Sequence, residues 1–142
     1  MTDLIEVRVS NLVGEALGWA VGKAEGLDVY LEPPGYNGVP WRVFARYQGL
    51  AIEHTKRYNP WEDWALGGQL VSKYQIALVP EAHDGMEGTE RSERWFADVY
   101  YSGGEQYTTE HCDSALIAAC QAVVATEFGD TVQVPKELIH AD

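Results

Sequence analysis

The segment that most constrains the fold lies near the C-terminus, where apolar residues recur at helical spacing for about four turns. Asp113 or Ser114 is positioned to cap the first turn, and Gly129 follows the last, as glycine commonly does. A helix with an apolar stripe must bury that stripe against another layer. We therefore predict a helix over residues 114–128 whose buried face consists of Leu116, Ile117, Ala119, Cys120, Val123 and Val124.

A second helix is predicted over about residues 13–25, with Ser10 or Asn11 as its cap and Gly26 at its end. Glycine recurs at every fourth position on one face of this helix, although each glycine costs a helix about 1 kcal/mol relative to alanine. We therefore expect that face to approach another backbone closely. It carries Gly14, Gly18 and Gly22.

The other periodic segments are short and are separated by glycine and proline, which is typical of strands. They predict strands at 4–9, 28–32, 41–47, 50–54, 75–79, 95–101, 105–109 and 131–134. A short helix is expected at 69–73. Residues 81–94 hold five acids and two arginines and are predicted to form a mobile acidic loop. Two main helices with a mostly antiparallel sheet indicate a single α+β domain over residues 1–142.

The net charge restricts the partners of the chain. It has 22 acids against 10 bases, a formal charge of −12, whereas binding of a long nucleic acid requires a basic face. The same charge argues against adsorption to an anionic membrane, and no apolar run reaches the roughly 18 residues of a membrane span.

Met1-Thr2-Asp3-Leu4 does not resemble a signal peptide, and Cys112 and Cys120 are too far apart on a helix for a disulfide. The chain is therefore predicted to be cytoplasmic.

One segment of the chain, residues 42–57, is positively charged although the chain as a whole is negative. Residues 42–57 carry four of the ten bases against the single acid Glu53, a local charge of +3. Three aromatic residues follow within seven positions. Cations beside aromatic rings suit a ligand with a planar ring and a negative charge, such as a nucleotide. The candidate residues are Arg42, Arg46, Lys56, Arg57, Tyr58, Trp61 and Trp64.

Gly67 and Gly68 add a candidate anion site, because glycines that open a helix leave backbone N–H groups free to meet a phosphate. The alternative is that the tryptophans are core residues and the two glycines form a turn. The sequence leaves both interpretations open.

The sequence contains no motif that indicates catalysis. His111-Cys112-Asp113 resembles a catalytic trio, but adjacent residues do not usually form a line of nucleophile, base and orienting group. No histidine has metal-ligand spacing, and the common phosphate-binding and nucleophile signatures are missing. We therefore expect neither an enzyme, nor a cofactor, nor a metal site.

Three segments resemble the NinX-like family of phage proteins. Ala16–Gly26 is similar to the family's N-terminal helix, and Tyr58–Gly68 to its central Tyr-x-Pro-x-x-Asp-Trp-Ala-x-Gly-Gly segment. Gly129–Pro135 is similar to its C-terminal ending, so the resemblance spans about residues 10–138. The chain departs from the family pattern where Trp61 and Glu62 replace Ser and Thr, and where Gln69 replaces Pro.

The resemblance implies a small accessory protein that a phage makes inside its bacterial host, from a family without an assigned activity. In that setting, the aromatic and basic residues favour an anti-defence sponge. Such a protein sequesters a small nucleotide-type immune signal, a cyclic oligonucleotide or cyclic ADP-ribose derivative, without converting it. Sponges often form symmetric homo-oligomers, for which the glycine face of helix 13–25 offers a packing surface. The alternative is an acidic protein–protein inhibitor or regulator of a host factor.

Overall fold

The computed structural model describes residues 3–48, 52–81, 94–101 and 104–139. Three α-helices lie in these ranges: α1 (Gly14–Ala24), α2 (Trp64–Tyr74) and α3 (Ala115–Phe128). The strands are β1 (Leu4–Arg8), β2 (Asp28–Glu32), β3 (Arg42–Gln48), β4 (Glu53–Arg57), β5 (Ala77–Pro80), β6 (Trp95–Tyr101), β7 (Glu105–Thr108) and β8 (Thr131–Pro135). The expected mobile loop at 81–94 falls almost entirely outside the described residues.

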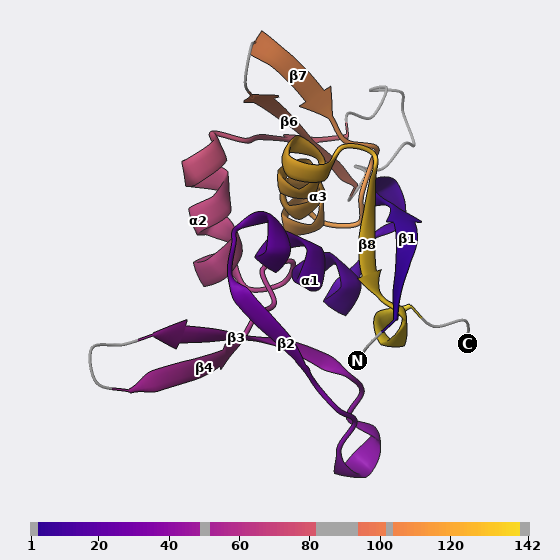
Figure 1. Ribbon diagram of the computed structural model, residues 1–142. Coiled ribbons are helices and arrows are strands. Elements are labelled where there is room, and N and C mark those ends of the chain that lie inside the picture. Colours follow the sequence, from indigo (N-terminus) through magenta and orange to yellow (C-terminus); the bar gives the residue numbers. More distant parts are fainter. Residues whose placement is uncertain (1–2, 49–51, 82–93, 102–103, 140–142) are drawn as a thin grey trace, which may run out of the picture.

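All the strand pairs among the described residues are antiparallel, and they form three small sheets, β1-β8, β2-β3-β4 and β5-β6-β7. Figure 1 shows α3 at the centre, with α1 and α2 beside it and the β2-β3-β4 sheet beyond α1. The α+β class predicted from the sequence is confirmed. All eight described strands lie within three residues of their predicted positions, and the largest shift, of three residues, is in β4, expected at 50–54.

Helix α3 is the centre of the hydrophobic core. It is buried on nearly every side from Ala115 to Ala125, whereas the sequence predicted one buried face. A helix that is apolar all round is stable only when other elements surround it, and α3 contacts α1, α2 and strands of two sheets. Its cap is Ser114, whose Oγ accepts a hydrogen bond from the Ile117 N–H at 3.1 Å.

The predicted limits of α1 are confirmed, but the predicted cap is wrong. Ser10 and Asn11 lie in a short 3₁₀ turn, and α1 follows the extended residue Val13 without a side-chain cap. At the other end Gly26 has a φ of +74°, a conformation that glycine adopts easily, and the next N–H closes the helix by bonding Gly22 O at 2.9 Å.

The glycine face of α1 does approach another backbone, but that backbone belongs to the same chain. A Cβ at Gly18 would lie 3.0 Å from Tyr58 O and closer still to the Trp61 ring, and one at Gly22 would clash with Val29. At these two positions the segment after β4 and strand β2 already occupy the face. The expectation that this face packs a second copy is therefore wrong.

Helix α2 begins five residues earlier than predicted. The Asp63 side chain accepts a hydrogen bond from the Ala65 N–H at 2.9 Å and caps the helix at Trp64. Gly67 and Gly68 therefore lie inside the helix and do not open it. Gly67 is buried, and a Cβ there would lie only 2.5 Å from Pro60 O and 2.6 Å from Leu116 Cδ2. A Cβ at Gly68 would make only an ordinary contact, 4.0 Å from Trp64 Cε3.

These two neighbouring glycines provide a matched test of the packing. We expect Gly67→Ala to lower the free energy of unfolding by about 1–3 kcal/mol, because the new methyl group overpacks the contact between α2 and α3. Gly68→Ala should raise it by up to about 1 kcal/mol through helix propensity. Chemical denaturation of both variants measures the difference, and equal effects would contradict the structure.

Candidate functional site

The predicted site residues do not form one cluster. The structure distributes them over the outer face of the β2-β3-β4 sheet, the joint between β4 and α1, the core, and a pocket beside α3. Only Trp61 and Trp64 line the same pocket.

Arg42 and Arg46 lie on the outer face of the sheet, where they stack on rings of the chain itself. The Arg46 guanidinium lies 4.0 Å from the Tyr30 ring centroid and donates to Asp28 Oδ1 at 3.1 Å. Arg42 lies 5.4 Å from the Phe44 ring, and Phe44 is paired with Tyr30 across the two strands. Alternation along β3 places Phe44 with the two arginines, but nothing in the sequence indicated that Tyr30 joins them.

Arg57 is neutralised by an acid from another element. Its guanidinium forms an ion pair with Glu15 at the start of α1, and it lies 5.9 Å from the Trp61 ring centroid. The other oxygen of Glu15 accepts a hydrogen bond from the Val43 N–H at 2.8 Å. Glu15 therefore joins α1, β3 and the end of β4, and the charge of Arg57 is used in the fold.

Lys56 and Tyr58 are also separated from the pocket. Lys56 is paired with Ala45, so it lies on the opposite face of the sheet from Arg46, beside Tyr47 and His54. Tyr58 is only 4% exposed and packs against Gly22 of α1. Burial raises the pKa of the Tyr58 hydroxyl above its ordinary value. Tyr58 and Gly67 are both buried, and Gly67 lies inside α2 instead of in a turn or at a helix start.

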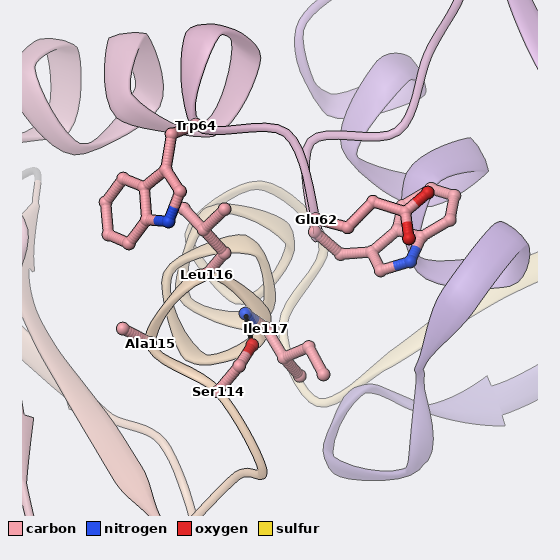
Figure 2. A pocket seen from close by; sticks show the side chains of 7 residues that line it. Glu62, Trp64, Ser114, Ala115, Leu116 and Ile117 are labelled. Atoms are coloured by element: carbon pink, nitrogen blue, oxygen red, sulfur yellow. Dashed lines mark hydrogen bonds between the residues drawn. The ribbon is translucent and has the colours of Figure 1, made fainter.

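The pocket lies between the loop before α2 and the first turn of α3, with a volume of about 340 Å³. Trp61 is half-buried, because its ring packs on Gly18, whereas Trp64 is 59% exposed. In Figure 2 the Trp64 ring and the Glu62 carboxylate point away from each other, with Leu116 between them. The pocket is lined by Trp61, Glu62, Trp64, Ser114, Ala115, Leu116 and Ile117.

The chemistry of this pocket combines an aromatic wall with the start of a helix. The first N–H groups of a helix have no carbonyl partner within it, and the helix dipole gives that end a partial positive charge. In α3 the Ile117 and Ala118 N–H groups bond to Ser114, whereas the N–H groups of Ala115 and Leu116 have no carbonyl partner within the helix. The one acid among the residues that line the pocket, Glu62, accepts a hydrogen bond from Asn59 Nδ2 at 2.9 Å.

His111 and Cys112 contact different partners. His111 Nδ1 lies 3.1 Å from Glu81 Oε2, whereas Cys112 is buried and its thiol lies 3.4 Å from Gln121 Oε1. Burial raises the pKa of the Cys112 thiol, although the nearby Arg94 partly offsets this effect. Within the described ranges, no group of three histidine, cysteine or acidic side chains is arranged to hold a metal ion.

We expect both thiols to react slowly with a disulfide reagent in the folded protein. Cys112 and Cys120 are buried, and burial raises both pKa values, so at pH 8 the reactive thiolate is a smaller fraction than for a free cysteine. Spectrophotometric titration with and without guanidinium measures the rates. A thiol that reacts rapidly in the native protein would contradict this account.

The contacts that Glu15 makes with Val43 and Arg57 should contribute measurably to stability. We expect Glu15→Ala to lower the free energy of unfolding by about 1–3 kcal/mol, because it leaves the Val43 N–H and Arg57 without their shared acceptor. Asp28→Ala removes the more exposed partner of Arg46 and should change stability by less than about 1 kcal/mol. Denaturant titration of the two variants compares their free energies of unfolding. A larger loss of stability in Asp28→Ala would contradict the stabilising role of the Glu15 contacts.

No described helix is long and apolar enough to cross a membrane.

Comparison with known proteins identifies the family. No curated protein matches the chain significantly. A protein-family model described as "Bacteriophage P22, NinX" matches residues 8–127 of the 142. The match covers well over half of the chain and includes α1, the Tyr58–Gly68 segment and most of α3, and the chain therefore belongs to the phage P22 NinX family.

Proposed function

We propose that this phage protein binds a small nucleotide-type ligand in the pocket beside α3 and sequesters it without chemical conversion. The observation that supports the proposal is the combination, in one pocket, of the Trp61 and Trp64 rings with the first turn of α3. A nucleotide has the two complementary groups, a flat ring and a phosphate.

The ring of the ligand stacks on Trp64, which is the more exposed of the two tryptophans. Its phosphate accepts hydrogen bonds from the N–H groups of Ala115 and Leu116, because a helix start binds anions through N–H groups and the dipole together. The volume of about 340 Å³ lies at the lower end of the range for ligand pockets. The pocket therefore holds one base with its nearest phosphate, and the rest of a larger ligand extends into solvent.

The source of positive potential in this proposal differs from the one that the sequence favoured. Arg46 and Arg57 are paired with Asp28 and Glu15, and Arg42 stacks on Phe44. The phosphate meets neutral N–H donors instead, which provide local attraction in a chain of net charge −12. The negative surface still repels long nucleic acids, so the protein selects small anions.

Membership of a phage family supports a specific role for this binding. Bacterial defences use cyclic oligonucleotides and cyclic ADP-ribose derivatives as signals, and a protein that holds such a molecule in the host cytoplasm lowers its free concentration. We infer an anti-defence role of this kind. It needs affinity and abundance, and it needs no catalytic group.

Calorimetry with a panel of cyclic dinucleotides and ADP-ribose isomers tests the proposal. We expect at least one of them to bind, and Trp64→Ala to weaken binding at least about fivefold, since loss of a stacked aromatic ring costs about 1 kcal/mol or more. Tyr100→Ala is the matched control, because Tyr100 is an exposed ring outside the pocket, 66% accessible. The ligand should be recovered intact after heat denaturation.

Three results would contradict the proposal. Absence of binding across the panel would oppose a nucleotide sponge, and capture of a host protein by the same preparation would favour the acidic inhibitor. Equal loss of affinity in Trp64→Ala and Tyr100→Ala would place the site elsewhere. Recovery of an altered ligand would indicate an enzyme.

A further inference from the structure

Strand β1 forms an open edge of the β1-β8 ribbon. In Figure 1 β8 lies between β1 and the helices, and β8 is the one strand that pairs with β1 in the described part of the chain. Four of the five β1 residues are exposed, including the apolar Leu4 and Ile5. An exposed strand edge with apolar residues is a template for pairing with another strand.

The hydrogen-bond pattern shows which backbone groups point outward. Lys136 N donates to Asp3 O at 3.0 Å, and Val9 N donates to Asp130 O at 2.8 Å. In an antiparallel pair such bonded positions alternate, so the odd-numbered β1 residues bond to β8. Pro135, which has no N–H, lies opposite the even-numbered Leu4 as this alternation requires. The N–H and C=O groups of Leu4, Glu6 and Arg8 therefore face outward.

The charges on this edge are self-complementary. Glu6 and Arg8 are two residues apart, both are exposed, and neither forms an ion pair with another described residue. A two-fold axis at Val7 would place Glu6 of each copy opposite Arg8 of the other. An axis at Glu6 would place the two Glu6 carboxylates opposite each other, which is unfavourable.

We propose that two copies of this chain pair antiparallel through β1, with the two-fold axis at Val7. Four backbone hydrogen bonds join Glu6 and Arg8 of the two copies, and two cross-strand ion pairs select this register. The two ribbons then form one four-stranded sheet, β8-β1-β1-β8.

Other outer strands are less suited to this pairing. Arg57 in β4 is already paired with Glu15, and Asp28 in β2 is paired with Arg46. Strand β5 ends in Pro80, which cannot donate a backbone hydrogen bond. Strand β7 has an acid, Glu105, but no base.

Complementary charge reversals test both the interface and its register by sedimentation equilibrium of the full chain. The wild-type protein should dimerise with a dissociation constant that rises with salt, since the ion pairs are exposed. Glu6→Arg and Arg8→Glu should each weaken dimerisation at least about tenfold, because each variant opposes two like-charged pairs. An equimolar mixture of the two variants should recover the dimer, because every opposed pair is then of opposite sign.

Glu105→Arg is the control, because it makes the same charge change on the exposed edge strand β7, and it should leave the dimer unchanged. Circular dichroism verifies that each variant is folded. A wild-type protein that stays monomeric at millimolar concentration would overturn the proposal. So would single variants that dimerise like the wild type, or a mixture that remains monomeric.

Discussion

The complete burial of helix α3 is the constraint on which the rest of the structure depends. Because water covers almost none of α3 from Ala115 to Ala125, both other helices and strands of two sheets have to approach it closely. The small side chains of the alanines along α3, and the absence of a side chain at Gly67, make that approach possible. Its buried polar group, Gln121, donates to Leu12 O at 2.9 Å and accepts from Cys112, so the interior retains no cost from an unpaired amide.

The sequence predicted the α+β class and the limits of α1 and α3, because periodicity and helix-ending glycines are local signals. Local signals failed where two of them competed. Around α2, the glycine pair indicated a helix start, but the Asp63 cap and the contact of Gly67 with α3 determine the observed one. A single sequence gives no information about such a distant contact, because Leu116 lies far along the chain from Gly67.

The candidate site was predicted in part for the same reason. Spacing grouped Arg42, Arg46 and Arg57 with the tryptophans, but the acids that neutralise two of these arginines come from α1 and β2. The aromatic half of the prediction is retained, since Trp61 and Trp64 line one pocket. The first turn of α3 was missed as a part of that pocket, although Ser114 already indicated where it begins.

The contact between Gly18 and Trp61 gives the pocket a second boundary, on the far side of the indole. Trp61 lines the pocket with one part of its ring and rests on Gly18 with another. A side chain at position 18 would displace that ring and change the shape of the cavity. A substitution at Gly18 in α1 therefore changes the shape of the pocket through the position of the Trp61 ring, although Gly18 does not line the pocket. Relatives that keep both tryptophans but lose this glycine should differ in the shape of this pocket.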